Sequence, residues 1–135
     1  MSFVVDSSIA LSWLLPDERG APAEDLIDRL TTAGAVAPPL WWLEVGNGLT
    51  TAQRRGRLSV SDVDRALDLL AALPIAIDAE ATVRLVDGLI ALARKHGLTT
   101  YDACYLELAK RRGWPLATLD TKLRTACAAE GIAVL

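Results

Sequence analysis

Residues 3–8 read FVVDSS: three apolar residues, an aspartate and two serines. The run Phe3-Val4-Val5 predicts a short, buried β-strand. The apolar segment that follows, Ile9 to Leu15, predicts a helix, so Asp6 stands where a strand gives way to a helix. The rest of the chain repeats this alternation, and the alternation decides the fold.

Further short apolar runs are separated by helical stretches in the same way. These runs are Ala35-Val36-Ala37, Ile75-Ala76-Ile77, Leu116-Ala117-Thr118-Leu119 and Ile132-Ala133-Val134. Short, continuous apolar runs suit strands that helices cover on both faces. We therefore expect an α/β fold with a five-stranded parallel sheet flanked by helices. The length of 135 residues and the lack of a linker or repeat predict a single domain, residues 1–135.

Residues that begin and end helices predict where the later helices lie. The first of these runs from Pro22 to Gly34. The second has Ser61 as its cap and an inner face of Val63, Ala66, Leu67 and Leu70. The third has Asp78 as its cap, ends at Gly97, and has an inner face of Val83, Val86, Ile90 and Ala93. A fourth follows Thr99 and Thr100, and a short fifth follows Asp120.

Composition excludes several classes of protein. Hydrophobic residues make up 52% of the chain and charged residues 23%, which is enough to fill a core. No apolar run reaches the roughly 20 residues that cross a bilayer, and the N-terminus has no basic leader, so we expect a cytoplasmic protein. The net charge of −3 argues mildly against nonspecific nucleic-acid binding but does not exclude a nucleic-acid enzyme.

The two cysteines and the single histidine argue against several catalytic mechanisms. Cys104 and Cys127 lack a CxxC spacing and read as small core residues. The single histidine, His96, precedes Gly97 at an expected helix end, where a cation suits the helix dipole. Without a histidine base, hydrolysis here would depend on carboxylates and a metal ion.

Carboxylates do follow two of the predicted strands. Asp6 comes directly after the first strand and Asp120 directly after the fourth. Ligands bind at the carboxyl ends of parallel strands, so the two carboxylates share one crevice if these strands are neighbours. The alternative is that both are helix N-caps. The caps could also be Ser7 or Ser8 in the first helix and Thr121 in the last, which would leave the aspartates free for another role.

Glu44 lies in an otherwise apolar helical segment, WWLEVGNGL, residues 41–49. No basic residue stands three or four positions from it, and an unpaired charge in such a setting costs several kcal/mol. Gly46 and Gly48 each cost about 1 kcal/mol of helix propensity, which a close backbone approach would explain. The alternative is an exposed face with an incidental glutamate.

Asp102 stands near the start of the helix that follows Thr99. It can simply complement the helix dipole in a capping box with Thr99. The alternative is that Asp102 belongs to a cluster with the other three acids. Such a cluster cannot stay fully ionised unaided, because two charges at about 4 Å repel by roughly 4 kcal/mol. A hard cation bound by oxygen ligands, Mg²⁺ or Mn²⁺, would relieve that repulsion and activate water for phosphodiester hydrolysis.

At this point the sequence resembles a known family, the PIN-domain ribonucleases, and especially the VapC toxins of bacterial toxin–antitoxin pairs. The matching pieces are Val4-Val5-Asp6-Ser7-Ser8, Glu44-Val45-Gly46-Asn47, Tyr101-Asp102-Ala103-Cys104-Tyr105-Leu106-Glu107-Leu108-Ala109 and Ala117-Thr118-Leu119-Asp120. Each motif is weak alone, but the order, the spacing and the total length all fit. The resemblance covers the whole chain.

The resemblance implies a function and a site. It implies a three-layer PIN fold, commonly a homodimer, that cuts structured RNA such as transfer or ribosomal RNA with Mg²⁺ or Mn²⁺. Asp6, Glu44, Asp102 and Asp120 would form the catalytic metal site, supported by Ser8, Asn47 and Thr118. A cognate antitoxin would hold the enzyme inactive by covering its acidic pocket. A free-standing PIN nuclease of RNA processing and a catalytically silent PIN-fold binding module are the alternatives.

Other residues are candidates for contacts with RNA or with a partner. The basic candidates for holding RNA are Arg54, Arg55, Arg57, Lys122 and Arg124. The tryptophans, Trp13, Trp41, Trp42 and Trp114, read as core or groove lining rather than as stacking platforms. Because Ile9 to Leu15 is apolar nearly all round, we expect an exposed groove between this helix and the one from Pro22, with Leu11 and Leu14 receiving an antitoxin segment.

Two other enzyme classes place an aspartate after the first strand of a similar sheet. Aspartyl-phosphate phosphatases need a second aspartate two residues on, where this chain has Ser8. Receiver domains need a lysine after a late strand, and none stands there. A binding module without turnover predicts a broken acidic set, whereas all four acids are intact.

Overall fold

The computed structural model describes residues 2–15, 21–80 and 82–135. Parallel strands alternate with helices along these residues, as the apolar runs predict. The strands are β1 (Phe3–Val5), β2 (Ala35–Ala37), β3 (Ile75–Ile77) and β4 (Leu116–Ala117). The helices are α1 (Ser7–Leu14), α2 (Ala21–Ala33), α3 (Leu40–Arg54), α4 (Val60–Ala72), α5 (Thr82–His96), α6 (Thr100–Arg112) and α7 (Thr121–Ala129).

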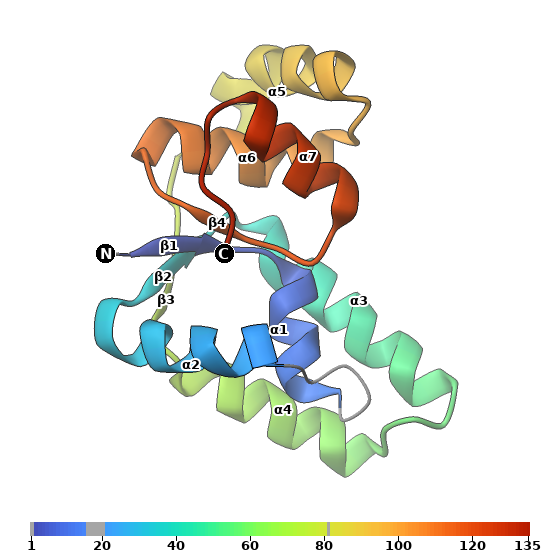
Figure 1. Ribbon diagram of the computed structural model, residues 1–135. Helices are drawn as coiled ribbons and strands as arrows, with labels where there is room; N and C mark the ends of the chain where they lie inside the picture. Colours follow the sequence, from blue (N-terminus) through green and yellow to red (C-terminus); the bar gives the residue numbers. More distant parts are fainter. Residues whose placement is uncertain (1, 16–20, 81) are drawn as a thin grey trace.

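The sheet has the order β3-β2-β1-β4, and every pairing in it is parallel. In Figure 1, α5, α6 and α7 lie above the sheet and α1, α2 and α4 lie below it, while α3 runs beside α1. The three-layer arrangement is therefore confirmed. β1 and β4 are neighbours, with Val5 opposite Ala117, so the residues that follow the two strands lie at the same end of the sheet, as expected.

Burial explains why the short strands hold together. All three residues of β1 are fully buried, and they pack with Trp41, Tyr105 and other core side chains. Helices on both faces exclude water from this sheet, so continuous apolar strands are stable there. None of the helices within the described residues is both long enough and apolar enough to cross a bilayer.

The expected fifth strand, Ile132–Val134, is wrong as a full strand. The C-terminal segment forms one parallel bridge, Val134 with Leu116, supported by hydrogen bonds from Leu116 N to Ala133 O (2.9 Å) and from Leu135 N to Leu116 O (3.0 Å). Longer pairing is prevented on both sides. Ile132 N still donates back to Cys127 O in the turn after α7, and β4 ends at Ala117, two residues before the predicted end at Leu119.

The predicted cap of α4 is also wrong by half a turn. Ser59, not Ser61, caps this helix, because its hydroxyl accepts a hydrogen bond from Asp62 N while the Asp62 carboxylate accepts one from Ser59 N. This reciprocal pair satisfies two backbone donors at once, and the helix therefore begins at Val60, one residue before Ser61. Val63, Ala66 and Leu70 are buried as expected, whereas Leu67 is exposed.

Asp78 does not cap α5, which begins four residues later at Thr82. Its carboxylate turns instead to two arginines of α6, described below. Because the helix starts later, its packed face differs from the predicted one. Leu89 and Ala93 are buried against Ala103, whereas Val86 is exposed and Ile90 only half-buried. The side chain of Val83 lies outside the described residues.

Candidate active site

Asp6 is a buried carboxylate at the carboxyl end of β1. It is 4% exposed, and its backbone N–H continues the sheet by donating to Ala117 O at 3.2 Å. Oδ1 accepts hydrogen bonds from Ile9 N (3.2 Å) and from the Ser8 hydroxyl (2.6 Å), and Oδ2 accepts one from the Thr118 hydroxyl. Burial raises the pKa of Asp6 to about 6, against the lowering effect of these hydrogen bonds.

Two hydroxyls connect Asp6 to the segment that leaves β4. Ser8 Oγ accepts a hydrogen bond from Leu119 N at 2.9 Å, and Thr118 Oγ1 accepts one from Asp120 N at 3.0 Å. Ser8 and Thr118 thus contact Asp6 directly, and their role as a supporting shell of a metal site stays a prediction. They bring Asp120 to the same end of the sheet.

The capping interpretation is correct for both strand-end aspartates. Asp6 caps α1, and Asp120 caps α7 by accepting a hydrogen bond from Leu123 N at 2.8 Å. The rival caps Ser7, Ser8 and Thr121 do not take this role. Capping engages one oxygen of each carboxylate, so it does not conflict with a second role in the crevice.

Glu44 enters the site from α3. It is half-buried, and its Oε1 accepts a 2.5 Å hydrogen bond from the hydroxyl of Tyr105, a buried residue of α6. Burial raises the pKa of Glu44 and the nearby Asp102 charge raises it further, whereas the Tyr105 hydroxyl lowers it. The charges of Glu44 and Asp6 both contribute to the raised pKa of Tyr105, so this side chain lies near both acids.

Asp102 lies in the first turn of α6, where its N–H donates to the Thr99 hydroxyl at 3.1 Å. Burial raises its pKa, and the charge of Asp120 adds to the effect. The charge of Asp120 thus raises the pKa of Asp102, and the charge of Asp102 raises the pKa of Glu44. Glu44, Asp102 and Asp120 are therefore linked pairwise by their charges, and Asp6 joins them through Tyr105, on which the charges of both Glu44 and Asp6 act.

The ion pairs among the described residues leave this group without a cation. The basic partners of those pairs all belong to Asp62, Asp78, Glu107 and Glu130. Burial is the main cause of the raised pKa values of Asp6, Glu44 and Asp102, and no ion pair of the described residues offsets it. Such a donor set, oxygen only, fits a hard divalent cation.

The side chains as placed do not enclose an ion by themselves. Within the described part of the chain, no three Asp, Glu, His or Cys side chains stand close enough together to hold one metal ion. Mg²⁺ usually keeps several waters and binds through only one or two carboxylates. A water-rich site, with the remaining acids acting through those waters, is therefore compatible with this geometry.

Asn47 and several apolar side chains border the acidic group. Asn47 is exposed one turn after Glu44, and both line a groove of about 380 Å³ between α1, α3 and the start of α6. We call this groove the Tyr101 groove; its walls are Leu11, Leu40, Leu43, Glu44, Asn47 and Tyr101.

The Tyr101 groove corrects the expected position of the apolar groove. Leu11 lies between α1 and α3, not between α1 and α2. Gly48 explains why, since a Cβ there would lie 2.5 Å from Leu11 Cδ1 and glycine lets the two helices approach. Leu14 lines a separate groove with residues of α4, including Leu69. No comparable contact explains Gly46.

The basic candidates divide by position. Lys122 lies two residues after Asp120 and lines a pocket with His96. Arg124 donates to Thr118 O at 2.8 Å and to Leu135 O at 3.3 Å, so it ties the C-terminal segment to the site. Arg54 lies ten residues after Glu44 on α3, about 15 Å along the helix axis, and Arg55 and Arg57 lie beyond it.

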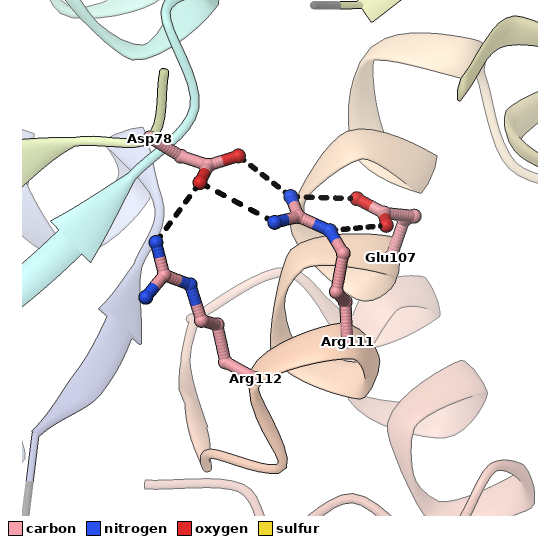
Figure 2. Close-up of polar contacts among 4 residues, drawn as sticks. All are labelled: Asp78, Glu107, Arg111 and Arg112. Carbon is pink, nitrogen blue, oxygen red and sulfur yellow. Dashed lines mark hydrogen bonds and ion pairs between the residues drawn. The ribbon is translucent and has the colours of Figure 1, made fainter. Parts of the chain in front are cut away.

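A second polar cluster lies at the same carboxyl-terminal end of the sheet, where β3 ends (Figure 2). Asp78 accepts hydrogen bonds from Arg111 (2.6 Å) and Arg112 (3.1 Å), and Arg111 also donates to Glu107 at 2.7 Å. Hydrogen bonds from Arg111, then from Arg112, lower the pKa of Asp78 although it is only 5% exposed. Sequence reasoning missed this cluster.

Histidine and cysteine take structural positions. His96 Nε2 lies 2.8 Å from Glu130 Oε1, and the His96 hydrogen bond with those of Lys95 and Lys110 lowers the pKa of Glu130 to about 2. Burial raises the pKa of both Cys104 and Cys127 to about 11, so neither thiol is reactive near neutral pH. Trp13 and Trp41 are buried, as expected of core residues.

Comparisons with known proteins agree with the motifs. The profile of the PIN domain family matches residues 3–129. Ribonuclease VapC3 of Pyrobaculum aerophilum is 33% identical over 123 residues, which cover 91% of this chain and 92% of the relative.

Solved structures share the fold at lower identity. A crystal structure of a Pyrobaculum aerophilum protein superposes with a TM-score of 0.72 at 24% identity, covering 99% of this chain and 83% of that one. A toxin–antitoxin complex from Klebsiella pneumoniae superposes with a TM-score of 0.65 at 16% identity, covering 98% of this chain and 95% of that chain. These likenesses show the fold of the chain.

Proposed function

This chain belongs to the PIN-domain family and, within it, to the VapC ribonucleases, and on that premise we propose that it is a metal-dependent endoribonuclease, the toxin of a toxin–antitoxin pair. The proposed substrate is structured RNA, transfer or ribosomal, and residues 1–135 act as a single PIN domain. The observation that carries the proposal is the set of four acids, Asp6, Glu44, Asp102 and Asp120: the pKa values of the first three are raised, and none of the four takes part in the ion pairs of the described residues.

In this proposal Asp6, Glu44, Asp102 and Asp120 hold Mg²⁺ or Mn²⁺, directly or through water. When bound, such an ion lowers the pKa of a water molecule and neutralises charge on the phosphodiester. The protein's own groups prepare the acids. The hydroxyls of Ser8 and Thr118 fix the Asp6 carboxylate, and the Tyr105 hydroxyl orients Glu44.

The proposed supporting role of Asn47 is different. Its amide lies in the Tyr101 groove beside Glu44, at the exposed end of the site, so it would act on the substrate side rather than hold a carboxylate. Lys122, two residues after Asp120, is the basic residue that we assign to a phosphate of the RNA. Arg54, Arg55 and Arg57 would hold more distant phosphates, and Arg124 keeps its contact with Thr118 O.

A cleavage assay tests the proposed activity. Purified protein is incubated with total cellular RNA in Mn²⁺, in Mg²⁺ and with a chelator, alongside Asp6→Asn. We expect discrete RNA fragments with either ion and none with the chelator or the variant. Cleavage that persists in chelator would contradict metal dependence. Binding of RNA without cleavage in any ion would favour the silent binding module.

A growth assay separates a toxin from a free-standing nuclease of RNA processing. Expression of the chain alone in a bacterial host should arrest growth, and Asp102→Asn should relieve the arrest while the protein stays folded. Continued growth with the active wild-type nuclease would favour the processing enzyme. The proposed location is the cytoplasm, where the RNA is.

The proposed partner is a cognate antitoxin that lays an apolar segment on the toxin and covers the acidic pocket. The solved toxin–antitoxin complex with the same fold supports this assignment. Leu14 and Leu69 line an open groove between α1 and α4 that suits such a segment. Leu14→Glu should weaken antitoxin binding without loss of cleavage. We also propose a homodimer, which light scattering of the purified chain would test.

A further inference from the structure

Tyr101 is an exposed aromatic residue at the edge of the acidic group. Its side chain is 66% exposed, and it directly precedes Asp102 in the first turn of α6. No hydrogen bond or ring contact engages it within the described residues. Across the Tyr101 groove, Leu43 is 76% exposed and precedes Glu44 on α3. Two large apolar surfaces therefore flank the two acids.

The charges of the groove restrict what can enter it. Among the described residues that line it, Glu44 is the single charged one, and they include no arginine or lysine. A phosphate would be repelled by that carboxylate, so the groove does not suit the RNA backbone. A flat, neutral, partly apolar ligand with polar groups at its edge suits it better. Its volume of about 380 Å³ is within the range of small-ligand pockets, roughly 300–1,000 Å³.

We propose that the Tyr101 groove is a nucleobase subsite, which takes one unpaired base of the RNA next to the scissile phosphate. This inference rests on the proposed function. The base stacks on the Tyr101 ring and contacts Leu43 on its other side. The Asn47 amide, which can both donate and accept, meets the base edge. Unpaired bases are commonly stacked on aromatic side chains in RNA recognition.

The position of the groove favours a base over a segment of protein. Glu44 belongs both to the groove and to the acidic group, so a ligand in the groove stands beside the phosphate to be cut. The groove is the size of one flat ligand. A stable protein interface buries about 1,200–2,000 Å² in total, which needs a far larger surface.

Kinetics of RNA cleavage test the subsite with matched variants. On an RNA that the wild type cuts, Tyr101→Ala should lower kcat/KM about tenfold, mainly through KM, because base–aromatic stacking is lost. Tyr101→Phe should stay within about twofold, since the ring remains. Val86→Ala, a control at an exposed apolar residue of α5 outside both grooves, should leave kcat/KM unchanged. Melting temperatures confirm that the variants are folded.

Equilibrium binding gives an independent readout. A single-stranded oligoribonucleotide with 2-aminopurine is titrated with Asp6→Asn and with Asp6→Asn/Tyr101→Ala. Stacking should quench the fluorescence in the first protein and not in the second. Quenching without any cleavage by the wild type would overturn the proposed function but keep the subsite. The subsite would be overturned if Tyr101→Ala had the kcat/KM of the wild type and Asp6→Asn/Tyr101→Ala quenched as strongly as Asp6→Asn. A Tyr101→Ala protein that cuts RNA normally but no longer binds a co-expressed protein partner would also overturn it.

Discussion

Asp6 and Asp78 occupy equivalent places in the sheet but have opposite electrostatic environments. Each directly follows a parallel strand, each extends the ladder through its backbone N–H, and they are 4% and 5% exposed. Neutral donors surround Asp6, whereas the guanidinium groups of Arg111 and Arg112 surround Asp78. The pKa of Asp6 is therefore raised to about 6, and that of Asp78 is lowered.

The difference shows which buried acid supports the fold and which is available for chemistry. Hydroxyl and amide hydrogen bonds satisfy a carboxylate but do not offset the cost of burying its charge. Two arginines do. The two arginines compensate the charge of Asp78 within the protein, whereas for Asp6, Glu44, Asp102 and Asp120 we propose a cation from outside, since perturbed acids often mark functional sites.

The largest effect should appear in catalysis. Asp6→Asn should lower kcat/KM for RNA at least about a hundredfold, because the amide can still cap α1 but cannot bind a divalent cation. Asp78→Asn should stay within about threefold of the wild type at a temperature where it is folded, since its partners are structural. Initial rates of RNA cleavage at saturating Mn²⁺ measure both. Equal losses of kcat/KM in Asp6→Asn and Asp78→Asn would contradict the different roles assigned to the two aspartates.

The next effect concerns stability and pH in the absence of divalent cations. Because the Asp6 pKa is raised from 3.8 to about 6 in the folded state, the unfolded chain ionises first as pH rises. The free energy of unfolding should therefore fall between about pH 4 and pH 6, by about 3 kcal/mol in all. Urea titrations of the wild type and of Asp6→Asn measure it, and the variant should lack this fall.

Divalent cations supply the control for that measurement. Above about pH 6, saturating Mg²⁺ or Mn²⁺ should restore most of the lost stability in the wild type, because binding to the ionised folded state adds to it. Asp6→Asn should respond much less. A wild type that is insensitive to both ions would argue against metal binding at Asp6.

Removing the other aspartate should lower stability with the opposite pH dependence. Asp78→Ala should cost about 2 kcal/mol at neutral pH, less than for a fully buried pair because both arginines are partly exposed. Since the Asp78 pKa is lowered, this contribution is present above the unfolded pKa and is lost as pH falls through the folded pKa. Thermal unfolding at about pH 7 and pH 3 measures the change, and an equal cost at both values would contradict it.

The smallest effect should come from Tyr105→Phe. Loss of the hydroxyl removes the hydrogen bond that lowers the pKa of Glu44, so that pKa should rise further. The acid limb of the pH–rate profile should then move to higher pH, while stability falls by only about 1 kcal/mol. An unchanged profile would show that Tyr105 packs against the site without orienting Glu44.

Much of the fold and the site is determined by the sequence alone. Local patterns suffice where the partner of a residue is near in the chain: apolar runs predict β1, β2 and β3, and Asp6 and Asp120 cap helices that start one residue later. Motif spacing also predicts a site of four acids. Parallel strands carry two of them, Asp6 and Asp120, to one end of the sheet, because the carboxyl ends of such strands lie together.

The tertiary structure alone decided the partners that lie far away in the chain. Asp78 has the local pattern of a helix cap, yet it pairs with arginines 33 and 34 residues later, since α6 brings two charges to a buried carboxylate. Tyr105 reaches Glu44 across 61 residues, and the C-terminal run forms one bridge because β4 has already ended. Charge compensation and strand pairing depend on distance in space, and a sequence fixes that distance only after the chain has folded.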